Sequence, residues 1–141
     1  MRGHTLVELL FILTLLGATT ASLAPTARQY RDRASVVAAR EALVGVLSEA
    51  RLAAMESGEA IARVTVDPAV VAATVRDSTI RRVALGSEYG VVVSLNGGQS
   101  EVGLRFDALG LGRLAGQTIG IERGEASADL IVSSYGRVRR P

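Results

Sequence analysis

The chain has 141 residues and a formal net charge of +2, so its overall charge gives no argument for nucleic-acid binding. It contains no cysteine, which excludes a disulfide framework, a thiolate nucleophile and a cysteine metal cluster. Its length leaves room for one modest domain behind a long N-terminal segment.

The first 27 residues consist of a short basic leader, Met1-Arg2-Gly3, and an apolar run with one acid, Glu8. The nineteen residues from Leu9 to Ala27 are uncharged. As a helix rising about 1.5 Å per residue, they nearly match the roughly 30 Å hydrocarbon core of a bilayer. A secretory signal peptide and a plain membrane anchor are two interpretations. Both leave Glu8 unexplained, because a charge inside a membrane helix costs about 2.5–3.5 kcal/mol.

The helical pattern continues beyond the apolar run. Apolar residues recur at three- and four-residue spacing and form one stripe, made of Val36, Ala39, Leu43, Leu47, Ala50 and Ala54. Pro25 removes one backbone hydrogen bond and is expected to bend the helix without ending it. Ser57-Gly58 is a stop signal. The sequence therefore predicts one long bent helix from Thr5 to Ser57.

After Gly58 the pattern becomes strand-like, with glycine-rich turns. The predicted strands are Ile61 to Val66, Thr79 to Leu85, Tyr89 to Leu95, Val102 to Phe106, Gln117 to Glu122 and Asp129 to Ser134. Ala69 to Val75 fits either a strand or a short helical turn. The predicted fold class is α+β: a long bent N-terminal helix packed on one antiparallel sheet or two small ones.

The leader adds a more specific signal. The residues Gly3-His4-Thr5-Leu6-Val7-Glu8-Leu9-Leu10 resemble the processing site of type IV pilins and type II secretion pseudopilins. The resemblance implies that a prepilin peptidase/methyltransferase cuts after Gly3 and methylates the new N-terminus at His4. His4 departs from the family, in which the first mature residue is usually Phe. Pro25 falls where the family often has a helix-bending proline.

The C-terminal half carries a looser resemblance to the GspH/FimT pseudopilins. It rests on Leu104 to Gly110, on Ile131 to Arg139 and on the Ala-Arg-x-x-Ala element at Ala50 to Ala54. The resemblance implies a pilin-like fold with four segments: a leader (1–3), a transmembrane and filament-core half helix (4–27), an amphipathic half helix (28–57) and a periplasmic β-rich domain (58–141). Arg2, ahead of the apolar run, favours a single-pass inner-membrane protein with a cytoplasmic N-terminus.

Glu8 has a purpose in such a subunit. On assembly it is expected to pair with the amine at His4 of a neighbouring subunit, which turns an unpaired charge into a buried ion pair. The alternative is that Glu8 lies at the cytoplasmic membrane interface and pairs with nothing.

Catalytic patterns are missing from the sequence. His4 is the only histidine, so no Ser-His-Asp set can form, and there is no G-x-x-x-x-G-K-[ST] motif. No loop has calcium-binding spacing. We expect neither an enzyme nor a cofactor or metal site, and we expect the protein to be the substrate of a prepilin peptidase.

The C-terminus gathers three arginines, Arg137, Arg139 and Arg140. Arginine forks bind phosphates well, and the order Gly136-Arg137-Val138-Arg139 resembles the tail of FimT-type minor pilins linked to DNA uptake. The alternative is a solvated edge strand whose charges prevent aggregation.

The sequence thus favours a minor pseudopilin that assembles with other pseudopilins near the tip of a type II secretion filament and helps move exoproteins. The second hypothesis is a FimT-like minor type IV pilin that binds DNA. The third is a membrane-anchored β domain with no filament role.

Overall fold

The computed structural model describes residues 5–113 and 116–141, without the side chains of residues 18–25. The helices are α1 (Leu6–Ser57), α2 (Leu85–Tyr89) and the short 3-10 turn η1 (Asn96–Gly98). The strands, in chain order, are β1 (Glu59–Thr65), β2 (Val70–Val75), β3 (Ser78–Val83), β4 (Val92–Leu95), β5 (Glu101–Asp107), β6 (Gln117–Arg123), β7 (Ala126–Val132) and β8 (Val138–Arg139).

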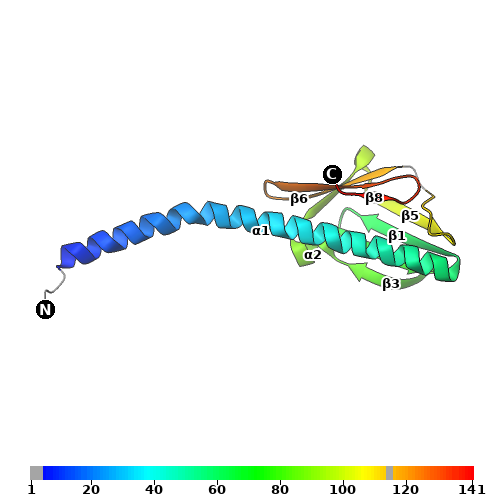
Figure 1. Cartoon of the computed structure of the whole chain (residues 1–141), viewed down its shortest axis with the longest axis horizontal. Coiled ribbons are helices and arrows are strands. Elements are labelled where there is room, and N and C mark those ends of the chain that lie inside the picture. The colour runs from blue at the N-terminus through cyan, green and yellow to red at the C-terminus, as the bar shows by residue number, and fades with distance from the viewer. Residues whose placement is uncertain (1–4, 114–115) are drawn as a thin grey trace.

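Helix α1 confirms the predicted long N-terminal helix. Thr5 is its N-cap, and the hydroxyl of Thr5 accepts a hydrogen bond from the Glu8 amide at 3.4 Å. Gly58 is its C-cap and donates its amide hydrogen to the Ala54 carbonyl at 2.8 Å. The helix runs through Pro25 as one element and curves gently (Figure 1). The side chain of Pro25 lies outside the described residues, so a bend at that residue stays a prediction.

The strands form two antiparallel sheets of four strands each, in the orders β3-β2-β1-β5 and β4-β6-β7-β8. The second half of α1 lies across both sheets (Figure 1). The α+β class is therefore confirmed, and the structure selects two small sheets over one.

The predicted apolar stripe of α1 forms one wall of the core. Each of its members is at most 2% exposed: Val36, Ala39, Leu43, Leu47, Ala50 and Ala54. Alternate strand residues supply the opposite wall; in β1, for example, Ala60, Ala62 and Val64 are buried and their neighbours are not. Small residues on both walls let the backbones of helix and sheet approach closely.

Two expected strands are wrong at the ends that border α2. The strand predicted from Tyr89 begins only at Val92, because Leu85 to Tyr89 form α2. Leu85 is fully buried, and the Glu88 carboxylate accepts from the Ala84 amide at 3.2 Å at the start of the helix. Accordingly β3 stops at Val83, two residues before the predicted end. Five residues are too few to show a helical period in the sequence.

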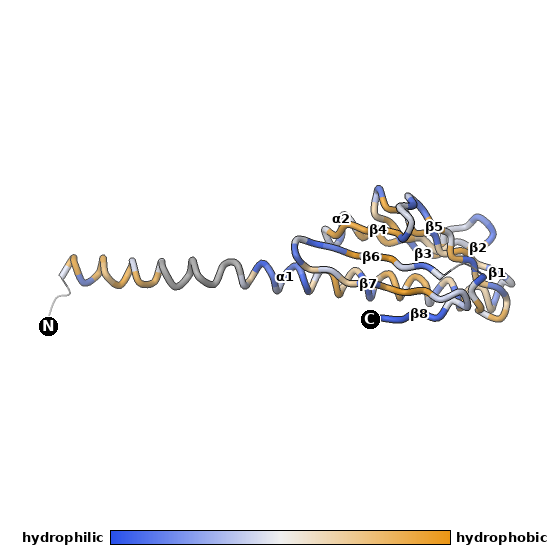
Figure 2. Tube along the Cα trace, turned by 90° about the horizontal axis from the view of Figure 1, so that it is seen from above, coloured by the Kyte–Doolittle hydropathy of each residue, from blue (hydrophilic) through white to orange (hydrophobic). Residues whose placement is uncertain are grey.

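The first half of α1 projects away from this core as an apolar stem (Figure 2). Its large apolar residues are exposed, from 52% for Ile12 to 75% for Leu6. They are Leu6, Val7, Leu9, Leu10, Phe11, Ile12, Leu13, Leu15 and Leu16. Among the residues that the structure describes, no helix has an apolar stretch long enough to cross a membrane.

Arg123 joins α1 to the domain near the point where the helix leaves it. Its Nε donates to the Asp32 carboxylate at 2.9 Å, and its Nη1 donates to the Ser35 hydroxyl at 2.9 Å. The same Nη1 donates to the Tyr89 carbonyl. One side chain at the end of β6 therefore connects α1 with the C-terminus of α2.

We expect Arg123→Met to lower the free energy of unfolding by about 2–4 kcal/mol, because it removes charge-assisted hydrogen bonds from partly shielded partners. Arg63→Met is the matched control, since the Arg63–Glu101 ion pair joins side chains that are 54% and 44% exposed and should contribute at most about 1 kcal/mol. Urea unfolding of the full chain in non-ionic detergent measures both. Equal losses in the two variants would contradict the role assigned to Arg123.

Candidate functional site

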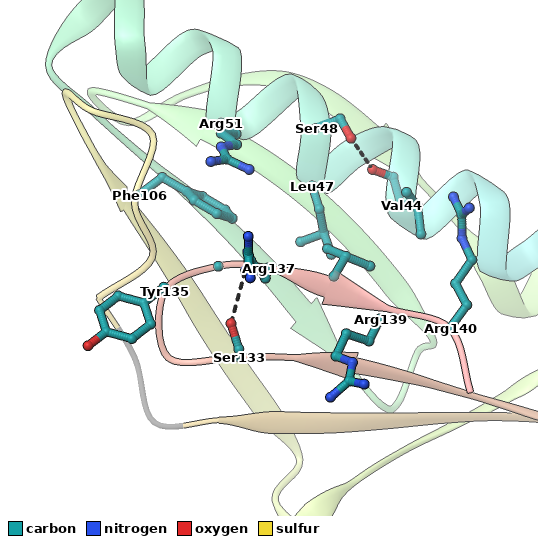
Figure 3. A pocket seen from close by; sticks show the side chains of 12 residues that line it. Val44, Leu47, Ser48, Arg51, Phe106, Ser133, Tyr135, Arg137, Arg139 and Arg140 are labelled. Atoms are coloured by element: carbon teal, nitrogen blue, oxygen red, sulfur yellow. Dashed lines mark hydrogen bonds between the residues drawn. The ribbon is translucent and has the colours of Figure 1, made fainter.

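A groove of about 1060 Å³ separates α1 from the C-terminal segment. Val44, Leu47, Ser48 and Arg51 line it from the helix, and Phe106 lines it from β5. Its other side is residues 133 and 135–140, which include β8 (Figure 3). The groove thus brings together α1, the end of the first sheet and the predicted arginine tail.

Backbone hydrogen bonds to β7 fix the C-terminal segment. β8 pairs with β7 in the register Ile131↔Arg139 and Val132↔Val138. The Ser133 amide donates to the Arg137 carbonyl at 2.9 Å, and the Arg137 amide donates to the Ser133 hydroxyl at 3.1 Å. β8 is therefore an edge strand, which is the backbone arrangement that the alternative interpretation of the tail assumed.

The three arginines of the tail have different surroundings. Arg140 Nη2 lies 2.9 Å from Glu41 Oε2, and the other oxygen of Glu41 lies 3.5 Å from Arg40 Nε. Arg137 and Arg139 are exposed on either side of the half-buried Val138. Only Arg140 is thus bound back to the helix.

Arg51 is a fourth arginine at this groove, and sequence reasoning missed it. Within the described chain, no carboxylate pairs with Arg51, Arg137 or Arg139, so the groove carries three unneutralised guanidinium groups. In the sequence, Arg51 stands out only because it follows Ala50, a residue of the buried stripe. That position does not predict which strand Arg51 faces.

A tight turn follows β5 and lies against Arg51. The Asp107 carboxylate accepts the amides of Leu111 and Leu109, each at 3.0 Å. The Leu111 amide, followed by the Leu109 amide and the Arg113 guanidinium, lowers the pKa of Asp107 below its ordinary value. Gly110 lies against Arg51 and Met55. The glycine-rich segment after Phe106 is therefore a hydrogen-bonded turn.

Of the predicted processing residues, Gly3 and His4 lie outside the described residues. Glu8 is the third residue of α1, and its amide also donates to the Thr5 carbonyl at 3.0 Å. Thr5-Leu6-Val7-Glu8 has the spacing of a capping box, and an acid in the first turn is favourable to the helix dipole. This position suits a local role of Glu8 in starting α1, and the role in assembly stays a prediction.

In residues 5–113 and 116–141, no three histidine, cysteine, aspartate or glutamate side chains are grouped so that they could hold a metal ion.

No protein-family model and no curated protein matches this sequence. Solved structures do match it. The type IV minor pilin FimU of Pseudomonas aeruginosa superposes with a TM-score of 0.62 over 77% of this chain and 90% of that one, at 18% identity. A second crystal form of FimU gives a TM-score of 0.58 over 74% and 90%, also at 18% identity. The fold is pilin-like. At this identity the likeness establishes the architecture alone.

The pilin-like head depends on a close backbone approach at Gly136, which holds the tail against β5. Gly136 has φ 76°, and a Cβ there would lie 2.9 Å from both Gly112 N and Phe106 Cε1. Gly97 has nearly the same φ, 74°, but open space around it. An alanine at Gly97 would therefore lose stability only through its left-handed backbone, whereas an alanine at Gly136 would lose stability through both the backbone and a steric clash.

We expect Gly97→Ala to lower the free energy of unfolding by about 1–2 kcal/mol, because of its backbone conformation alone. Gly136→Ala should cost about 1–3 kcal/mol more, because its methyl group meets backbone atoms that cannot move aside freely. Chemical unfolding of both variants tests this. Equal costs would show that the tail is not held as described.

Proposed function

We propose that this protein is a minor subunit of a type IV pilin-like filament. The observation that carries the proposal is the exposed apolar half of α1, which projects from a pilin-like head. So large an apolar surface needs a cover of lipid or of other apolar helices. A filament of packed N-terminal helices supplies one after assembly, and the inner membrane supplies one before it.

The leader supports the same proposal. The resemblance around Gly3 and His4 implies cutting after Gly3 and methylation of His4 by a prepilin peptidase/methyltransferase. Leu9 to Ala27 are uncharged, which suits residence in the inner membrane with the N-terminus in the cytoplasm and the head in the periplasm. The cut would leave Glu8 four residues beyond the new amine, in the place that the family uses for assembly.

Within this class we propose the pseudopilus of a type II secretion system, with other pseudopilins and exoproteins as partners. The GspH/FimT-like segments Leu104 to Gly110 and Ile131 to Arg139 support this choice. They form β5 with its turn and the tail beside the groove. Neighbouring genes for a secretin and a secretion ATPase would agree with it, whereas neighbouring competence genes would contradict it.

The second candidate is a FimT-like minor type IV pilin that binds DNA, and the match to a type IV minor pilin favours it. Arg137 and Arg139 would contact phosphates, with Arg51 across the groove. Arg140, which the sequence offered as a third contact, would first have to leave Glu41.

The direct experiment is intact-mass spectrometry of the protein purified from its native host. We expect the loss of Met1 to Gly3 and the gain of one methyl group. Gly3→Val is the control and should keep the precursor mass, because the peptidase cuts after glycine. A wild-type chain that retains Met1 to Gly3 would contradict both filament candidates.

Glu8 offers a second prediction. Glu8→Gln and Glu8→Ala should both be processed normally but be largely lost from the filament fraction, because removing one side of a buried ion pair costs about 3–5 kcal/mol. Copurification with filament partners measures the loss. Glutamine still fits a capping box, so normal assembly of Glu8→Gln together with a defect in Glu8→Ala would assign Glu8 to helix capping instead.

A further inference from the structure

β8 is the outermost strand of its sheet, and it borders the groove facing α1 (Figure 3). Residue pairs in an antiparallel ladder alternate between hydrogen-bonded and non-bonded. Because Ser133 and Arg137 are a bonded pair, Val132 and Val138 are a non-bonded one. The amide and carbonyl of Val138 therefore point away from β7, toward the open edge.

Arg140 directly follows β8, and in an extended chain the same alternation would direct its backbone groups to the open edge as well. A further strand beside β8 would form hydrogen bonds with every second residue, which is the spacing of Val138 and Arg140. In the part of the chain that the structure describes, β8 pairs with β7 alone, and no other backbone group bonds Val138 or Arg140. The edge thus presents an unused donor–acceptor ladder.

The side chains around this edge have a definite character. Arg137 and Arg139 are exposed next to Val138, whose own side chain packs toward the core. The half-buried Val44 and Val138 give the groove an apolar floor above the buried Leu47 and Phe106, and Arg51 lies at the same groove. A strand laid along β8 would meet apolar surface on one of its faces and arginines on the other.

We propose that the open edge of β8 binds an extended acidic segment of a partner polypeptide by strand addition. The segment alternates acidic residues, which pair with Arg137 and Arg139, with apolar residues, which enter the groove. Main-chain hydrogen bonds supply affinity and the alternate side chains supply specificity. This goes beyond the proposed filament function and does not depend on it.

Nucleic acid suits the same surface less well. Phosphate binding needs cations alone. It would leave the ladder at Val138 and Arg140 unused and the apolar floor uncovered, and Glu41 already neutralises Arg140. A peptide would bond to the backbone groups of the open edge, cover the apolar floor of the groove and pair with the arginines.

The probe is a fluorescent hexapeptide of alternating glutamate and valine, titrated by anisotropy against the full chain in non-ionic detergent. A lysine–valine hexapeptide should not bind. The double variant Arg137→Gln/Arg139→Gln should weaken binding of the acidic peptide by roughly three- to tenfold, as expected for two cross-strand charge pairs. Arg81→Gln/Arg82→Gln on β3 is the charge-matched control and should bind as the wild type does.

Val138→Pro distinguishes strand addition from charge attraction. Proline removes the outward amide of Val138 but no bond to β7, so the tail should stay folded. We expect about a tenfold or greater loss of peptide affinity from a chain that still folds, with the unfolding midpoint lowered only by the lost packing of the half-buried Val138 side chain. Unchanged affinity would overturn the proposal.

N-methylated peptides test the edge without altering the protein. In a strand, every second residue directs its amide to the same side. Methylation of either all the glutamates or all the valines should therefore abolish binding, and methylation of the other set should preserve it. Strand addition would be contradicted if the glutamate-methylated and the valine-methylated peptides both bound, or if neither of them did.

Other occupants give different results. If a short DNA duplex binds equally to the wild type and to Val138→Pro while the acidic peptide binds neither, the groove is a nucleic-acid site and the proposal is wrong. If the wild type forms a dimer that Val138→Pro dissociates, a second copy occupies the edge and the proposal is also wrong.

Discussion

The packing of one helical stripe against two sheets is the interaction on which the rest of the structure depends. The stripe from Val36 to Ala54 is the surface that both sheets share, and its buried alanines allow close approach. Among the described residues, neither small sheet has another helix of comparable length to cover its apolar face. A polar or bulky residue in the stripe would separate both sheets from α1 at once.

This division of α1 is the feature on which the proposed assembly rests. The second half buries its stripe within the chain, whereas the first half leaves apolar residues more than half exposed. Arg123 fixes where the buried part ends, through Asp32 and Ser35. The head is therefore fixed to the second half of α1, and the proposed filament would cover the stem. A filament subunit has this requirement, and a self-sufficient globular domain does not.

Local patterns were enough to predict the long helix, its C-terminal cap, its stripe and most strands. The three- and four-residue spacing of Val36 to Ala54 and the Ser57-Gly58 stop depend on near neighbours alone. Helix α2 was missed because Leu85 is buried by tertiary packing, which overrides a short strand-like pattern. The groove was beyond sequence reasoning, because Arg51 meets Arg137 and Arg139 only through the course of the chain between them. The pairing of Arg140 with Glu41 is long-range in the same way.

Site-specific photocrosslinking in living cells tests the filament account most directly. A crosslinking residue at Leu13, on the exposed stem, should form adducts with another subunit that carries the same leader pattern. The same residue at Ile80, on the outer edge strand β3, serves as the comparison for contacts of the head. Subunit adducts from Leu13 would support assembly through the stem. The absence of any protein adduct from Leu13, in cells where the machinery is expressed, would contradict it.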